Sequence, residues 1–63
     1  MRIKIKDAMT ALDMEKPYQL ALFLGLTRQA GYYWLDQGME YLPDLARYRL
    51  LEKRPELRRL VEE

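Results

Sequence analysis

Apolar residues recur at helical spacing in several short segments of the chain, and glycine or proline residues separate these segments. The first segment predicts a helix over about residues 6–13. Before it, residues 2–5 (RIKI) alternate basic and apolar side chains, a pattern typical of a short strand. Four residues make a weak signal and no partner strand is evident, so the pattern leaves the N-terminal strand open.

A second helix is expected over about residues 17–24, because the proline that opens it fits a first helical turn, where its missing N–H costs no hydrogen bond. Gly25 follows directly, and glycine adopts the left-handed backbone that ends many helices without steric cost. Thr27 suits an N-cap, since its hydroxyl accepts a hydrogen bond from a free backbone N–H. A third helix is therefore expected over about residues 28–37, ending at Gly38.

Two prolines divide the rest of the chain into predicted helices within about residues 43–62. Pro43 fits a helix start, and Asp44 is placed favourably near the positive end of the helix dipole. Pro55 interrupts the pattern before a last short helix. The predicted apolar stripes comprise Leu45, Tyr48 and Leu51, widened by Ala46 and Leu50, and then Leu57, Leu60 and Val61. The chain is expected to be one small all-α domain, residues 1–63, with four to five helices.

Two short helices joined by a tight turn that contains glycine define a helix-turn-helix, here over about residues 17–37. At about 100° per residue, the second helix of this motif has two distinct faces. The face expected to point outward carries Arg28, Gln29, Tyr32, Tyr33 and Asp36. The face expected to pack on the preceding helix carries Ala30, Gly31, Trp34 and Leu35.

The outward face has the composition of a DNA-recognition helix. Arginine pairs bidentately with guanine and glutamine with adenine, and Arg28 and Gln29 occupy the first turn, where such helices touch base edges. Tyr32 and Tyr33 follow one turn later, within reach of phosphates, sugars or a thymine methyl group. These four side chains are the candidate base contacts. The candidate contacts to the DNA backbone are Lys16, Tyr18, Gln19 and Thr27.

The segment QLALFLGLTRQAGYYWL resembles the helix-turn-helix of the Cro and related phage repressors. That family places a small residue in the first helix, a glycine–apolar turn, and a buried residue late in a polar second helix. The residues that fill these places are Ala21, Gly25, Leu26, Ala30 and Trp34. RIKIKDAMTALD is similar to the family's opening strand and first helix, so the resemblance covers roughly residues 2–42, and the prolines beyond favour the helical C-terminal type.

The resemblance implies a small transcriptional repressor without cofactors. It would act as a homodimer, weakly associated when free, on a pseudo-palindromic double-stranded DNA operator. Gly31 departs from the family pattern, which has a bulky aliphatic residue there. Glycine inside a helix costs about 1 kcal/mol relative to alanine. We expect Gly31 to lie against the preceding helix, with a large side chain such as Trp34 or Met9 filling the space.

Composition excludes several other classes of function. Without cysteine or histidine, the chain has no disulfide, no zinc site built from those residues and no histidine-dependent catalysis. The acidic residues are scattered and no Gly-Lys-Ser/Thr phosphate loop is present, so neither enzymatic activity nor a small-molecule substrate is expected. The longest apolar run, residues 20–26, is too short to span a membrane, and residues 1–8 lack the apolar core of a signal peptide. A cytoplasmic protein is expected.

A net charge of +1 leaves a second interpretation open, because bulk charge alone does not favour DNA. The alternative is a protein-binding helical module, such as an antitoxin-like or adaptor domain, anchored by Tyr32 and Tyr33, since tyrosine is enriched in interface hot spots. A chain this short buries only about 60% of the surface of its unfolded form. We therefore expect the helices after Pro43 to fold back on the core and to leave some apolar surface for a second copy.

Overall fold

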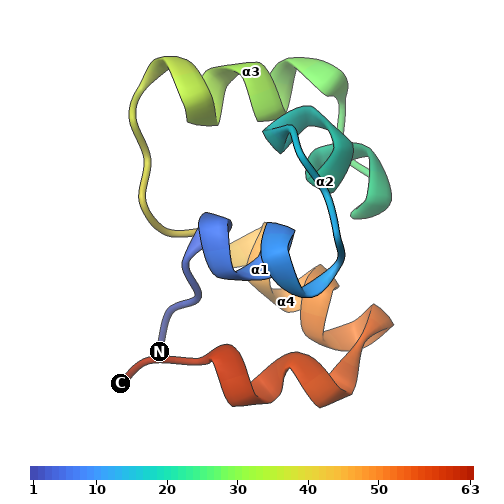
Figure 1. The fold of residues 1–63 in the computed structure, drawn as a ribbon, viewed down its shortest axis with the longest axis vertical. Coiled ribbons are helices and arrows are strands. Elements are labelled where there is room, and N and C mark those ends of the chain that lie inside the picture. The colour runs from blue at the N-terminus through green and yellow to red at the C-terminus, as the bar shows by residue number, and fades with distance from the viewer.

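The computed structural model describes residues 1–63 as five helices without a strand, which confirms the predicted all-α class. The elements are α1 (Ile5–Ala11), α2 (Pro17–Phe23), α3 (Arg28–Asp36), α4 (Asp44–Lys53) and the 3-10 helix η1 (Pro55–Leu60). Figure 1 shows α2 and α3 together at one end of the molecule and η1 at the opposite end, with α1 and α4 between them.

Local backbone signals set the boundaries of the helix-turn-helix. Gly25 and Gly38 both have left-handed backbones, with φ of +76° and +61°, directly after the C-cap residues of α2 and α3. The Thr27 hydroxyl accepts a hydrogen bond of 3.3 Å from the backbone N–H of Ala30, as an N-cap should. The predicted helices and turn in this part of the chain therefore agree with the structure to within a residue at each end.

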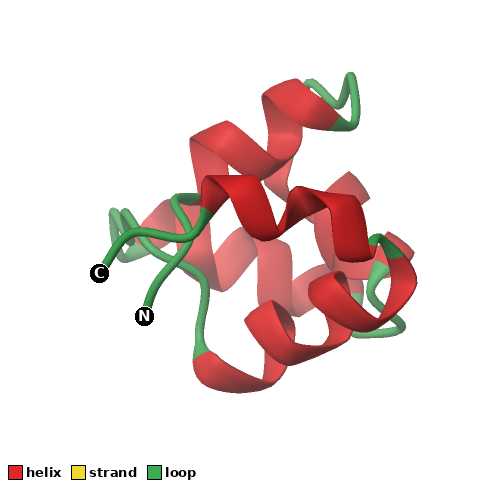
Figure 2. Cartoon of the chain, turned by 90° about the horizontal axis from the view of Figure 1, so that it is seen from below, coloured by secondary structure: helices red, strands yellow, loops and turns green.

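The N-terminal segment is not a strand. Residues 2–4 are extended, but they make only isolated antiparallel bridges with two different partners, Arg2 with Glu62 and Lys4 with Tyr41. The chain then enters α1 at Ile5, before either pairing can continue. The alternating pattern thus marks a short connector that ties both the C-terminus and the α3–α4 loop to the core. As a result, the two termini lie side by side (Figure 2).

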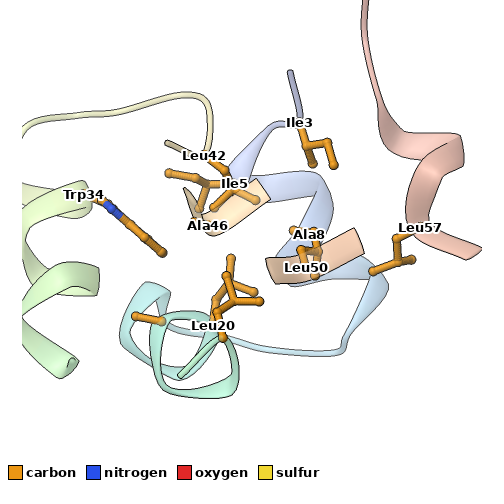
Figure 3. Packing of buried hydrophobic residues seen from close by; sticks show 11 residues of the cluster. Ile3, Ile5, Ala8, Leu20, Trp34, Leu42, Ala46, Leu50 and Leu57 are labelled. Carbon is orange, nitrogen blue, oxygen red and sulfur yellow. The ribbon is translucent and has the colours of Figure 1, made fainter. Parts of the chain in front are cut away.

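One apolar cluster fills the centre of the molecule (Figure 3). Its eleven residues are Ile3, Ile5, Ala8, Leu20, Ala21, Leu24, Trp34, Leu42, Ala46, Leu50 and Leu57. Trp34 enters this cluster from α3 and Leu57 from η1, on opposite sides. Leu57 is only 2% exposed, so the segment after Pro43 does fold back onto the core.

The face that α4 buries differs from the predicted one. Ala46 and Leu50 are 1% and 0% exposed, whereas Leu45 and Tyr48 are 54% and 61% exposed. The spacing allows two apolar stripes on α4. The stripe that contains Ala46 faces the core, because the small alanine side chain lets the helix approach more closely. The ends of the C-terminal helices also differ slightly, because Pro43 takes the N-cap position and the last helix is 3-10 rather than α.

The inward position predicted for Leu35 is also wrong, because its side chain is 67% exposed. α3 packs mainly on α2, which covers the half of α3 near the turn. Leu35 lies beyond that contact, at the rim of a hollow of about 540 Å³ that α3 shares with α1 and the α3–α4 loop. Leu35 also borders the outer face of α3, beside Tyr32 and Asp36, so its side chain lies at the edge between the two faces and is not packed against another helix.

Candidate nucleic-acid interface

The helix-turn-helix is held together by a close backbone contact at Gly31. A Cβ atom added there would lie 2.3 Å from Cα of Tyr18 and 2.8 Å from the carbonyl carbon of Pro17. No side chain occupies the space beside this glycine, contrary to the expectation for Trp34 or Met9. The start of α2 itself lies there, and glycine is the residue that permits this distance between the two helices.

The four candidate base contacts share the exposed side of α3. Arg28 and Gln29 are exposed in the first turn, and Tyr32 and Tyr33 are 49% and 59% exposed one turn later. Asp36 is exposed at the far end of the same helix and adds one negative charge. Three of the four candidates, Gln29 and both tyrosines, border a single shallow depression on this face. The outward set predicted from the sequence is therefore on one accessible surface.

Tyr18 joins this surface from α2. Its ring centroid is 5.7 Å from that of Tyr32, with the planes tilted by 52°. The guanidinium carbon of Arg28 lies over the same ring, 5.3 Å from its centroid. Both distances are within the usual range for aromatic pairs and cation–π contacts. The structure thus brings a candidate backbone contact, Tyr18, against two candidate base contacts.

Of the other candidate backbone contacts, Gln19 and Thr27 have part of their hydrogen-bonding capacity occupied, and Lys16 does not. The Gln19 side-chain oxygen accepts from the backbone N–H groups of Glu15 and Lys16, at 2.8 and 3.0 Å, so only its amide N–H group is left to donate outward. The Thr27 hydroxyl caps α3. The Lys16 side chain is exposed and forms none of the molecule's ion pairs.

Arg49 on α4 is a structural residue that the sequence reasoning missed. Its guanidinium donates hydrogen bonds of 3.1 Å to the carbonyl oxygens of Leu24 and Gly25, at the end of α2. Nearby, the ammonium of Lys53 lies 5.7 Å from the centroid of the Phe23 ring. Because these carbonyls have no partner within α2, Arg49 fixes the turn to the rest of the molecule. No local sequence signal marks a contact between residues 24 positions apart.

The groups with shifted pKa values lie away from this surface. Burial raises the pKa of the Tyr41 phenol, Arg2 opposes the shift, and Glu40 and Glu62 add to it. A hydrogen bond from Arg54 lowers the pKa of Glu56 on η1. Neither Tyr41 nor Glu56 lies on α2 or α3, so ionisation of these two groups affects the C-terminal half of the fold.

The chain offers no grouping of three acidic, cysteine or histidine residues arranged to hold a metal ion. No helix combines the length and apolar content that a membrane span requires. Comparison with protein families, with characterised proteins and with solved structures finds no match.

Proposed function

We propose that the protein binds double-stranded DNA sequence-specifically, as a small repressor of the Cro type, with α3 in the major groove. The observation that carries this proposal is the shared exposed face of α3, which presents Arg28, Gln29, Tyr32 and Tyr33 next to the start of α2. Helix-turn-helix proteins use this surface to reach base edges with the first turn of their second helix. The proposal includes a cytoplasmic location.

In this proposal the side chains divide into two roles. Arg28 and Gln29 read base edges from the first turn of α3, and the two tyrosines contact groove walls or a thymine methyl group. Lys16 contacts phosphate through its free ammonium, and Gln19 contacts phosphate through its side-chain N–H group. Repression is then steric, because the bound protein excludes polymerase or a competing regulator from the operator.

The same proposal includes a homodimer, since a two-fold pair presents two recognition helices about 34 Å apart to one face of the duplex. The exposed Leu45 and Tyr48 on α4 provide apolar surface for such contact. Met1, Tyr48 and Leu51 border a further hollow next to them. In sedimentation, Leu45→Gln should weaken self-association, whereas Leu22→Gln, a matched change at an exposed leucine on α2, should not.

Selection of bound sequences from a random duplex pool tests the function directly. The expected result is enrichment of an inverted repeat, bound with two protein chains per duplex. Affinity for the selected duplex should fall with salt, with a logarithmic slope of about −0.9 per neutralised phosphate. Absence of any enriched sequence, together with no salt-dependent binding, would contradict the proposal.

A protein-binding module is the second candidate, favoured by the apolar character of the same helix. Tyr33 and Leu35 are 59% and 67% exposed, and both border the depression on α3. Large exposed aromatic and aliphatic groups are typical anchors of protein interfaces. Under this alternative no duplex is selected, and mutation of Tyr33 instead abolishes capture of a protein partner.

A further inference from the structure

Arg28 is restrained by an aromatic ring rather than by a carboxylate. The molecule contains five ion pairs, and none of them includes Arg28. The group against its guanidinium is the ring of Tyr18, 5.3 Å away. Because Arg28 forms no side-chain hydrogen bond or ion pair, its guanidinium N–H groups remain free to donate, and such groups make the bidentate contact with guanine.

The position of the Tyr18 ring is itself fixed by the fold. Its Cα lies in the close contact at Gly31, so the backbone that carries the ring cannot move without separating α2 from α3. Tyr32 then packs against the ring from α3, with centroids 5.7 Å apart, and Tyr18 is half-buried as a result. The ring thus has one backbone anchor and one side-chain neighbour on the helix that bears Arg28.

We propose that Tyr18 is a positioning residue, which holds the guanidinium of Arg28 in the orientation that reads a base. This inference rests on the proposed DNA-binding function and gives Tyr18 a different role from the phosphate contact expected from the sequence. The ring face, not the phenol hydroxyl, is the active part. Gly31 takes part indirectly, because it permits the approach that brings Tyr18 within reach of Arg28.

Two variants separate the ring from its hydroxyl. Tyr18→Phe keeps the aromatic face, and Tyr18→Leu removes it while keeping an apolar residue that helices tolerate well. Each is titrated against the selected duplex and against duplexes with every base exchanged singly. Tyr18→Leu should lower base preference about two- to fivefold at the position read by Arg28, as expected for an exposed cation–π contact. Tyr18→Phe should retain that preference.

A double-mutant cycle provides the control. In an Arg28→Ala background, Tyr18→Leu should leave base preference unchanged, because the group it positions is gone. Circular dichroism of every variant separates loss of fold from loss of preference. In the free protein, the NMR signal of the Arg28 guanidinium N–H should carry a ring-current shift in wild type and in Tyr18→Phe, and should lose it in Tyr18→Leu.

The possible failures are distinguishable. If Tyr18→Phe and Tyr18→Leu weaken all duplexes by the same factor, the hydroxyl contacts phosphate and the positioning role is wrong. If Tyr18→Leu keeps full base preference while wild type shows it, the positioning role alone fails. If wild type shows no base preference at all, the proposed function is wrong, and the positioning role of Tyr18 is wrong as well. Lack of a ring-current shift in wild type would overturn the Tyr18–Arg28 contact whatever the outcome with DNA.

Discussion

The two halves of this small fold use their charged residues differently. All five ion pairs lie outside residues 16–38, among residues of the termini, the α3–α4 loop, α4 and η1. Within residues 16–38, the cations Lys16 and Arg28 have no carboxylate partner, and the two helices are joined by backbone proximity at Gly31. The charges that pair with one another lie outside the helix-turn-helix, while Lys16 and Arg28 within it remain available to a ligand.

This difference matters because each exposed ion pair contributes little to stability, about 0–1 kcal/mol. The C-terminal half is therefore held chiefly by its core residues, and the ion pairs add to the pairing of residues 2–4 with two distant segments. The helix-turn-helix forms no ion pair, and two hydrogen bonds from Arg49 on α4 connect it to the rest of the molecule. Substitutions of core residues in the first region should affect folding, and substitutions of exposed residues in the second should affect binding.

The largest effect is expected from Leu57→Ala in η1. Leu57 is 2% exposed, and truncation of a buried leucine costs roughly 2–5 kcal/mol through lost burial and a residual cavity. Urea denaturation, followed by Trp34 fluorescence, measures the free energy of unfolding. Leu45→Ala, at an exposed position of α4, is the matched control and should lower the free energy of unfolding by less than about 1 kcal/mol. Equal losses in the two variants would contradict the buried position of η1.

Arg28→Ala should act on binding and leave folding intact. We expect it to cost about 1–3 kcal/mol of specific binding and to relax preference at one base position. Lys16→Ala should instead weaken binding to all duplexes by a similar factor and lower the salt dependence. Competition binding against single-base variants of the selected duplex separates the two. If the two variants had the same base preferences, the proposed roles of Arg28 in reading bases and of Lys16 in contacting phosphate would be wrong.

Gly31→Ala should lower stability even though alanine favours helices. The gain in helix propensity is about 1 kcal/mol, but the added methyl group would lie 2.3 Å from Cα of Tyr18, against backbone that cannot rotate away. Overpacking of this kind costs about 1–3 kcal/mol, so the melting temperature should fall. Asp36→Ala, at an exposed position of the same helix, controls for propensity and should not lower it. A higher melting temperature for Gly31→Ala would argue against the close approach of the helices.

Arg49→Met should loosen the tie between the two halves. It removes two hydrogen bonds to the carbonyl oxygens of Leu24 and Gly25, at a cost of about 1 kcal/mol at this partly exposed site. Amide hydrogen exchange should rise most around the turn between α2 and α3. Arg49→Lys keeps the positive charge with a different donor geometry and should show a smaller increase. Unchanged exchange in Arg49→Met would mean that the turn is held without α4.

The smallest effect concerns pH and Tyr41. Burial raises the pKa of this phenol, so the folded protein binds the proton more tightly than the unfolded chain does. Stability from this group is therefore fully present below the ordinary tyrosine pKa of about 10 and declines as pH rises through the folded value. Tyr41→Phe should reduce the loss of stability above about pH 10. If the difference in unfolding free energy between wild type and Tyr41→Phe did not change with pH, the raised pKa would be contradicted.

Local sequence signals predicted much of the fold. The glycine after α2, the threonine before α3 and the proline that opens α2 each act on neighbouring backbone, so helix boundaries there were predicted to within a residue or so. The outward face of α3 was also predicted, because Arg28, Gln29 and the two tyrosines are exposed as helical periodicity requires.

Features that depend on distant partners could not be predicted in the same way. Leu35 has an apolar side chain and inward helical spacing, but it lies at the edge of the α3 surface that the other helices cover, so it is exposed. On α4, periodicity allowed two stripes, and packing against the core selected Ala46 and Leu50. The contacts of Arg49 with the turn and of Arg28 with Tyr18 join separate helices, so they follow from the tertiary arrangement and not from spacing along the chain.

The pairing of Arg2 with Glu62 makes the chain nearly a closed ring. Two backbone hydrogen bonds of 2.9 and 2.7 Å join these residues, at the end of the molecule opposite α3 (Figure 1). A short peptide linking the two ends would restrict the unfolded ensemble and leave the folded backbone unchanged, so a cyclised chain should melt at a higher temperature. The same closure would let new termini be opened in the α3–α4 loop, giving a circular permutant whose helix-turn-helix segment remains uninterrupted.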